Sequence, residues 1–296
     1  MNKFIKQAFT LIELLVVIAI IGILSGLIVI SMGGVTQKAT IAKAQVFSNS
    51  LRNSLMLNLI SDWKFDENTG TTTADTWNNT NSGSIVGGPA WKTGSDCVAG
   101  SCIYFDGVVG KYIDTNLVFS APSYITTEFW VNNSATADWQ AFLSAGQTVL
   151  SGSYLLFRRS ATDQLEYRYS NGTTSNLAVV KATYFTGYDN KWTLVTIAAD
   201  YVNNIVYFYR NGELLSPGVS MTTPVKPTTT YTRIGAYTST QYSVFGYLDE
   251  IRIYDAVIPT SQIKEHYYIG LNSLLSNGNI NKEEYKQMLT NSLANK

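Results

Sequence analysis

The chain has 296 residues and equal numbers of basic and acidic side chains, 21 of each, so its formal net charge is zero. The charge is unevenly spread: residues 1–60 carry a net charge of +4, residues 61–270 of −5 and residues 271–296 of +1. A net-acidic segment of this size lacks the basic footprint of a nucleic-acid-binding domain, which excludes DNA or RNA as the expected partner.

An apolar block fills the N-terminal segment. Residues 1–8 are short and basic, and residues 9–30 contain a single charge, Glu13. A helix over residues 9–30 would be about 33 Å long, which is enough to cross a bilayer. The preceding lysines are expected to stay in the cytoplasm and to send the rest of the chain outward. A carboxylate costs about 2.5–3.5 kcal/mol at a bilayer centre, so Glu13 is expected to have a partner.

The stretch from Ala8 onward, AFTLIELLVVIAIIGIL, closely resembles the prepilin signature of type IV pilins and type II secretion pseudopilins. The resemblance implies that a prepilin peptidase cuts between Ala8 and Phe9, and that the new amino group of Phe9 is methylated. It also implies that Glu13 pairs with the Phe9 amine of a neighbouring subunit. The family usually has glycine at the position of Ala8 and often proline at that of Ile30, and this chain departs from both patterns.

The same resemblance implies a location and a set of partners. The chain is expected to cross the bacterial cytoplasmic membrane once, with its C-terminus outside, and then to enter a surface pilus or pseudopilus. The implied partners are other pilin subunits, the prepilin peptidase and methylase, and the inner-membrane assembly machinery. A partial apolar stripe over residues 35–59 predicts that the helix continues, as an amphipathic segment, to residue 60.

The two cysteines, Cys97 and Cys102, are separated by four residues that include a glycine. Outside the cytoplasm a disulfide is the leading interpretation. The alternative is a pair of free, buried thiols.

From Trp63 the pattern changes to short runs of aromatic and β-branched residues between turn clusters. Asn211-Gly212 is a strong hairpin turn signal. About ten short strands in this region favour a two-sheet antiparallel sandwich. The predicted strands are residues 103–105, 111–114, 125–132, 154–158, 164–170, 192–198, 204–210, 233–237 and 245–254.

Three stretches in this region resemble the laminin-G-like, concanavalin-A-type jelly roll: residues 63–70 (WKFDENTG), residues 105–113 (FDGVVGKYI), and residues 246–254 (GYLDEIRIY) with the IPTSQI run after them. The resemblance covers residues 61–270. It implies adjacent first and last strands and a binding module for carbohydrate or extracellular protein. It also implies a structural Ca²⁺ in some members, for which Asp66 and Asp249 hold the matching positions. The alternative for these two residues is backbone hydrogen bonding at strand ends.

No catalytic set is evident, so the chain is not expected to be an enzyme. Glycoside hydrolases need two carboxylates facing each other across the sugar, and the glutamates of this region stand apart in the sequence. His266, the single histidine, follows the last predicted strand and is expected on the surface. Three aromatic residues in predicted loops, Trp139, Tyr237 and Tyr242, are candidate sugar contacts, since exposed aromatic faces can stack on sugars.

The last 26 residues read as two short helices around Asn277-Gly278-Asn279, with Asn281 as the N-cap of the second. The chain is therefore predicted to be mainly β, with a long N-terminal transmembrane and amphipathic helix, a jelly-roll sandwich and a C-terminal helical hairpin. The expected boundaries are a leader over residues 1–8, the pilin helix over 9–60 with the membrane span at 9–30, the sandwich over 61–270 and the hairpin over 271–296.

The function favoured by the sequence is a pilin-like filament subunit, a minor one because its outer domain is bulky. That domain would mediate adhesion to glycans or proteins. No cofactor is required, and a structural Ca²⁺, which some members of the family hold, is the one ion considered. The alternative is a type II secretion pseudopilin or a membrane-anchored carbohydrate-active enzyme.

Overall fold

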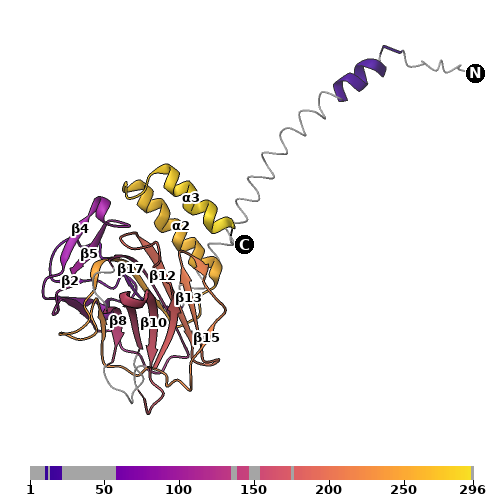
Figure 1. Ribbon diagram of the computed structural model, residues 1–296. Helices are drawn as coiled ribbons and strands as arrows, with labels where there is room; N and C mark the ends of the chain where they lie inside the picture. Colours follow the sequence, from indigo (N-terminus) through magenta and orange to yellow (C-terminus); the bar gives the residue numbers. More distant parts are fainter. Residues whose placement is uncertain are drawn as a thin grey trace, which may run out of the picture. The chain divides into compact units, whose positions relative to one another are not determined.

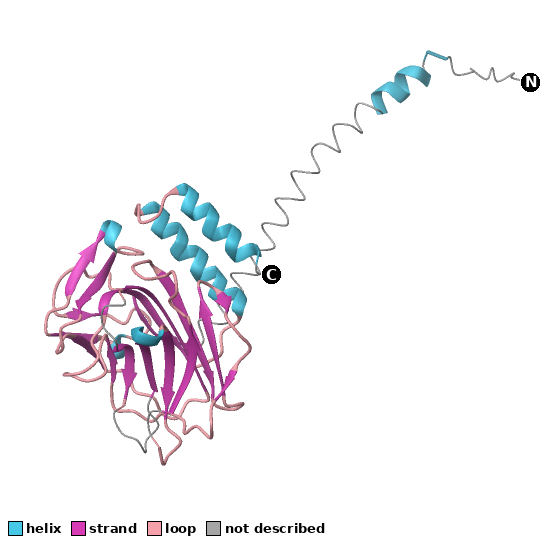
Figure 2. Ribbon diagram, in the orientation of Figure 1, coloured by secondary structure: helices cyan, strands magenta, loops and turns pink. Residues whose placement is uncertain are grey.

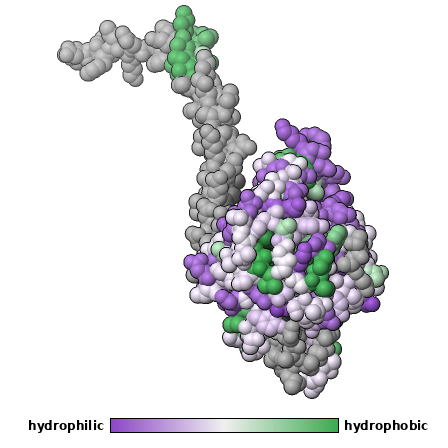
Figure 3. Space-filling model, turned by 90° about the vertical axis from the view of Figure 1, so that its left-hand side faces the viewer, coloured by the Kyte–Doolittle hydropathy of each residue, from purple (hydrophilic) through white to green (hydrophobic). Residues whose placement is uncertain are grey.

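The computed structural model describes residues 11–12, 14–21, 58–134, 139–146, 154–174 and 177–294. By internal contacts the chain divides into two units, residues 1–54 and residues 55–296. In the first unit, the residues described are helical and expose their large apolar side chains, which form one hydrophobic block in Figure 3. Within the described ranges, no helix is both long and apolar enough to cross a membrane.

The second unit is a sandwich of two antiparallel sheets with a pair of helices along one side (Figures 1 and 2). The nine-stranded sheet has the order β14-β13-β12-β7-β17-β5-β4, with β1 paired to β17 and β15 to β13. Its strands are β1 (Leu59–Trp63), β4 (Ala90–Thr93), β5 (Ser101–Asp106), β7 (Tyr124–Asn133), β12 (Thr193–Asp200), β13 (Ile205–Arg210), β14 (Glu213–Leu214), β15 (Val219–Ser220) and β17 (Phe245–Tyr254).

The eight-stranded sheet has the order β11-β10-β9-β8-β16-β6-β3-β2. Its strands are β2 (Thr72–Thr73), β3 (Gly83–Val86), β6 (Tyr112–Thr115), β8 (Trp139–Ala145), β9 (Tyr154–Arg159), β10 (Gln164–Tyr169), β11 (Leu177–Ala182) and β16 (Thr232–Ile234). Short 3₁₀ turns follow β2, β4 and β9. They span Asn79–Asn81, Gly94–Asp96 and Ser160–Thr162, respectively.

The main core lies between the sheets, where apolar side chains from the two inner faces meet. Phe129 of β7 and Phe142 of β8 contact one another across it, with ring centroids 5.2 Å apart. The first and last strands pair, Trp63 opposite Ile251, as the family resemblance implies. The turn Asn211-Gly212 joins β13 to β14 with φ of 52° and 82°, and positive φ at both central residues is what a two-residue hairpin turn requires.

Two predicted boundaries differ from the structure. The pilin helix was expected to reach residue 60, but β1 begins at Leu59, because pairing with β17 draws this segment into the sheet. The hairpin was expected from residue 271, but its first helix, α2, spans Thr260–Ser276. Its buried face includes Ile263, Tyr267 and Leu271, at helical spacing, which extends the apolar stripe well before residue 271.

The helices α2 and α3 (Lys282–Ala294) cover the outer face of the nine-stranded sheet. Tyr267 stacks on Trp130 of β7 with centroids 5.8 Å apart, and Gly270 lies so close to that indole that a Cβ atom would be 2.3 Å from it. Asn281 caps α3 as predicted: its Oδ1 accepts hydrogen bonds from the backbone N–H groups of Glu283 and Glu284. The hairpin thus belongs to the same compact unit as the sandwich.

Candidate functional site

The three aromatic residues predicted to contact sugar come together on the outer face of the eight-stranded sheet. Leu156 of β9 points into the main core, so its neighbour Phe157 points outward. The rings of Trp139, Tyr237 and Tyr242 surround Phe157, with centroids 6.1, 5.6 and 5.8 Å from its own. Tyr237 and Tyr242 also stack on each other at 5.9 Å.

Strand register and one long connection build this arrangement. Trp139 was expected in a loop, but it opens β8, where pairing with β9 places it opposite Arg159. Tyr242 lies in the connection between β16 and β17, as predicted. Tyr237 lies there too, because β16 ends at Ile234, before the predicted strand end at residue 237. Several hydrogen bonds hold this connection against β8. Among them, the Ala141 N–H donates to the Tyr242 carbonyl over 2.9 Å, and the Ser144 hydroxyl donates to the Tyr237 carbonyl over 3.1 Å.

Two arginines that the sequence did not single out complete the cluster. The guanidinium carbons of Arg159 and Arg168 lie 4.9 and 4.6 Å from the centre of the Trp139 ring, within cation–π range. Arg168 also forms a 2.8 Å ion pair with Glu166, which is buried. The available signal was strand alternation: Arg159 stands two residues after Phe157 and so shares its face. The aromatic–arginine platform below means Trp139, Phe157, Arg159, Arg168, Tyr237 and Tyr242.

Tyr242 is the exposed edge of this platform. Its relative exposure is 38% although it is a large aromatic residue, and its backbone has a φ of 57°. A left-handed conformation is unfavourable for a bulky side chain and costs of order 1–3 kcal/mol. The ring contacts of Tyr242 with the rest of the platform offset part of this cost, and the exposed part of the ring makes the position a candidate contact for a ligand.

The residues predicted to bind Ca²⁺ both hold the loop between the cysteines. Cys97 and Cys102 form a disulfide, with an S–S distance of 2.05 Å. Asp249 accepts hydrogen bonds from the backbone N–H groups of Val98 and Ala99, at 2.9 and 3.1 Å. Asp66 accepts one from the Ser101 N–H, at 3.2 Å. Asp66 and Asp249 thus make the backbone hydrogen bonds that were considered from the sequence as the alternative to Ca²⁺ binding.

Asp249 is fully buried, and burial raises the pKa of its carboxyl well above the usual range, with the nearby Glu250 as a further cause. Its Oδ1 atom has no hydrogen-bond partner. In the parts of the chain that the structure describes, no three His, Cys, Asp or Glu side chains gather as a metal centre. Asp66 and Asp249 therefore supply two carboxylates and no third acidic ligand.

A second group of carboxylates surrounds Arg252 on the outer face of the nine-stranded sheet. Its guanidinium pairs with Asp62 at 3.3 Å, with Glu128 at 3.8 Å and with Glu250. Glutamates that stand apart in the sequence are thus joined in space by the pairing of β7 with β17. His266 was expected on the surface, but α2 places it against this group of carboxylates. The Nδ1 atom of His266 lies 2.6 Å from Glu128 Oε1, and the histidine side chain is 14% exposed.

The processing and assembly residues Ala8, Phe9 and Glu13 lie outside the described residues. The sequence around them, residues 4–29, matches the prokaryotic N-terminal methylation motif. Residues 106–264 match the family described as the concanavalin A-like lectin/glucanases superfamily. A search of curated proteins finds no match to this chain.

Solved structures that share the fold include bacterial toxin binding domains. The botulinum neurotoxin serotype D ligand-binding domain, in complex with N-acetylneuraminic acid, is 16% identical with a TM-score of 0.58, over 73% of this chain and 52% of that chain. Botulinum neurotoxin type C, whose cell entry depends on two ganglioside molecules, is 12% identical with a TM-score of 0.55, over 75% and 53%. The binding domain of Paraclostridial mosquitocidal protein 1 is 15% identical with a TM-score of 0.58, over 74% and 53%. This chain thus spans about half the length of these structures, and the likeness establishes the fold alone.

Proposed function

This chain belongs to the concanavalin A-like lectin/glucanases superfamily, and from that premise we propose that it is a pilin-like filament subunit that displays a glycan-binding domain outside the cell. The N-terminal methylation motif supports the filament half of the proposal, because that motif implies processing by a prepilin peptidase and entry into a pilus. The lectin-like fold and the aromatic–arginine platform support the binding half.

The observation that carries the binding half is the exposed ring of Tyr242 in a left-handed backbone. Aromatic faces stack on the C–H faces of sugars, and guanidinium groups donate hydrogen bonds to hydroxyl or carboxylate oxygens. The platform offers both within one cluster. It also lies on the sheet opposite to the one that α2 and α3 cover, so the hairpin leaves it accessible.

The assembly half is tested by Glu13→Ala. The substitution removes the carboxylate that would neutralise a neighbour's Phe9 amine in an apolar bundle, so the variant should be absent from filaments sheared from cells while still present in membranes. Tyr242→Ala is the control and should appear in filaments like the wild type. Normal recovery of Glu13→Ala in sheared filaments would refute the filament role without touching the binding role.

The binding half is tested on a glycan array with the full-length protein in detergent. Tyr242→Ala should lose the signals that the wild type gives, because stacking is lost. Trp77→Ala is the matched control, since Trp77 is an aromatic residue with 43% relative exposure outside the platform, and it should keep them. Equal signals from both variants would exclude the platform as the binding surface.

The alternative, a secretion pseudopilin or membrane-anchored carbohydrate-active enzyme, has one feature in its favour, the carboxylates around Arg252. Glu128 in that group is fully buried beneath α2, which favours a structural ion-pair network over a substrate site. Release of reducing sugars from polysaccharides by the wild type, lost in Glu250→Gln, would favour the enzyme.

We also propose a structural Ca²⁺ at Asp66 and Asp249. The buried, unpartnered Oδ1 of Asp249 supports it, because a hard cation prefers such oxygen ligands. Backbone carbonyls or waters would have to complete the coordination, since a third acidic side chain is lacking among the described residues. Calcium should raise the melting temperature of the wild type relative to EDTA, and Asp249→Asn should abolish the difference. Identical melting with calcium and with EDTA would rule the ion out.

A further inference from the structure

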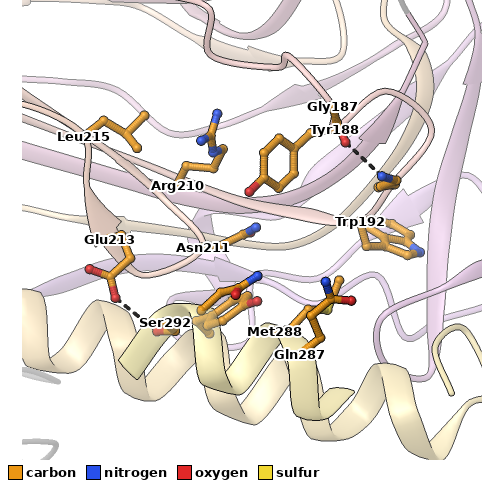
Figure 4. A pocket seen from close by; sticks show the side chains of 13 residues that line it. Gly187, Tyr188, Trp192, Arg210, Asn211, Glu213, Leu215, Gln287, Met288 and Ser292 are labelled. Carbon is orange, nitrogen blue, oxygen red and sulfur yellow. Dashed lines mark hydrogen bonds between the residues drawn. The ribbon is translucent and has the colours of Figure 1, made fainter. Parts of the chain in front are cut away.

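A second candidate site lies on the other side of the sandwich, where the helical hairpin meets the edge of the nine-stranded sheet. It is a pocket of about 350 Å³ between three segments: the connection before β12, the β13–β14 hairpin, and α3 with part of α2 (Figure 4). This volume is at the lower end of the range of small-molecule sites, about 300–1,000 Å³. A single sugar ring suits it better than an extended chain.

The wall contributed by α3 is mostly polar, and Met288 is the apolar side chain in it. Gln287 and Asn291 line the pocket from the helix, and Asn211 faces them from the turn between β13 and β14. Figure 4 shows the amides of Asn211 and Gln287 extending into the space between strands and helix. Asn211 Oδ1 accepts a hydrogen bond from the Leu194 N–H at 2.9 Å, which fixes the orientation of the side chain. Amide groups both donate and accept, as the hydroxyls of a sugar require.

The opposite wall is aromatic. Tyr188 and Trp192 come from the connection before β12, and Tyr267 comes from α2. Trp192 and Tyr267 are more than nine-tenths buried, so these side chains make this wall rigid. An aromatic wall can contact the C–H face of a sugar, and a wall of amides can bind its hydroxyl groups.

The charge of the pocket is positive. Glu213 is its one lining carboxylate among the described residues, and it is already neutralised: Lys264 Nζ lies 2.8 Å from its Oε1, and the Ser292 hydroxyl donates to the same oxygen. Lys191 and Arg210 have no carboxylate partner within the described ranges. The ammonium group of Lys191 donates to the Gly187 carbonyl, at 2.9 Å. The guanidinium of Arg210 lies over the Tyr188 ring and donates to the Tyr184 carbonyl.

We propose that this pocket binds a carboxylate-bearing monosaccharide, a sugar acid of the hexuronic class. The carboxylate would be held by Lys191 and Arg210, whose charges lack an internal partner. The hydroxyls would be held by the amides of Asn211, Gln287 and Asn291. The proposal does not depend on the platform, and it gives the C-terminal hairpin a functional role, because α3 supplies one wall of the site.

The test uses the full-length protein in detergent solution, with D-glucuronate, D-glucose and acetate as probes. Calorimetric titration and saturation-transfer NMR should detect glucuronate at a lower concentration than either glucose or acetate. Lys191→Gln and Gln287→Ala should each weaken glucuronate binding about tenfold, since each removes a hydrogen bond to the ligand. Both positions are exposed, so the variants are expected to fold. Added salt should weaken binding of glucuronate and leave that of glucose unchanged.

Lys286→Gln is the matched control for charge. Lys286 is an exposed lysine of α3 that pairs with Glu283 and does not line the pocket. It should bind glucuronate like the wild type, and so should Tyr242→Ala, which alters the platform. The proposal is overturned if glucose or acetate binds as tightly as glucuronate, if Lys286→Gln weakens binding as much as Lys191→Gln, or if glucuronate gives no signal. None of these results bears on the platform.

Discussion

His266 on α2 places its Nδ1 atom 2.6 Å from Oε1 of Glu128, a carboxylate on β7 without exposed surface. The other oxygen of Glu128, Oε2, accepts a hydrogen bond from the Thr196 hydroxyl at 3.1 Å, and Arg252 Nη1 lies 3.8 Å from Oε1. The imidazole also stacks on Tyr254 at 6.4 Å. A polar contact of this kind fixes where the helix sits on the sheet, whereas apolar packing alone allows small shifts.

Removing this contact should loosen the helix. His266→Ala leaves one oxygen of a buried carboxylate without its partner, so the free energy of unfolding should fall by about 1–3 kcal/mol. His266→Gln can still donate to Glu128 and should lose less. Urea denaturation measures both values, and an equal loss in the two variants would mean that the hydrogen bond contributes little.

Gly270→Ala should destabilise the protein although alanine is the better helix former by about 1 kcal/mol. The added Cβ would lie 2.3 Å from the Trp130 ring, and a fully buried indole has no room to move away. Ile269→Ala, one position earlier on the exposed side of α2, is the control and should stay within about 0.5 kcal/mol of the wild type. A higher melting temperature for Gly270→Ala would contradict the packing of α2 on β7.

The disulfide should stabilise both the sandwich and the hairpin. Asn279 Nδ2 donates to the Cys97 carbonyl at 2.7 Å, so the cysteine loop contacts the turn between α2 and α3. Replacing both cysteines by serine should cost about 2 kcal/mol on the loop-entropy account. It should also speed amide hydrogen exchange in that turn. Wild-type protein under reducing conditions should match the variant, and unchanged exchange would show that the turn docks without the loop.

Asp249→Asn should change how stability depends on pH. Burial raises the pKa of Asp249 in the folded protein. As the pH rises above about 4, Asp249 therefore ionises in the unfolded chain but stays protonated in the folded one. The free energy of unfolding falls over this range, until the pH reaches the raised pKa of the folded state. The variant has no such group. Its unfolding free energy minus that of the wild type should therefore increase with pH, by at most about 1.4 kcal/mol per unit. Parallel stability curves as the pH rises above about 4 would contradict the shift.

The strands that the sequence predicted are those whose aromatic and β-branched runs stand between clear turns, as β17 does between residues 245 and 254. The strand β8 was missed because it is buried on both faces and carries a register shift between Ala141 and Leu143, which removes the alternation that identifies a strand. The strand β11 was missed because its sequence, LAVVKA, contains leucine, alanine and lysine, which are helix formers.

The sequence predicted binding residues only where the residue type itself indicates the role, as an aromatic residue in a loop does for sugar binding. Exposed aromatics such as Tyr242 can be proposed from their loops, but Arg168 joins them through the register of β10 on β9, which no local pattern reveals. The pocket lies beyond sequence reasoning for the same reason, since Lys191, Asn211 and Gln287 belong to three segments far apart in the chain. His266 was placed on the surface because its polar neighbours gave no sign of the carboxylate beneath it.

The strand β17 lies beside β1, β5 and β7, all of which come much earlier in the chain. The nine-stranded sheet therefore cannot close until residue 254 has been made. Contacts of such long sequence separation fold slowly, and the strand edges that wait for β17 are open to pairing with other chains in the meantime. The yield of native protein should therefore fall as the concentration of folding chains rises, because open strand edges then meet one another more often.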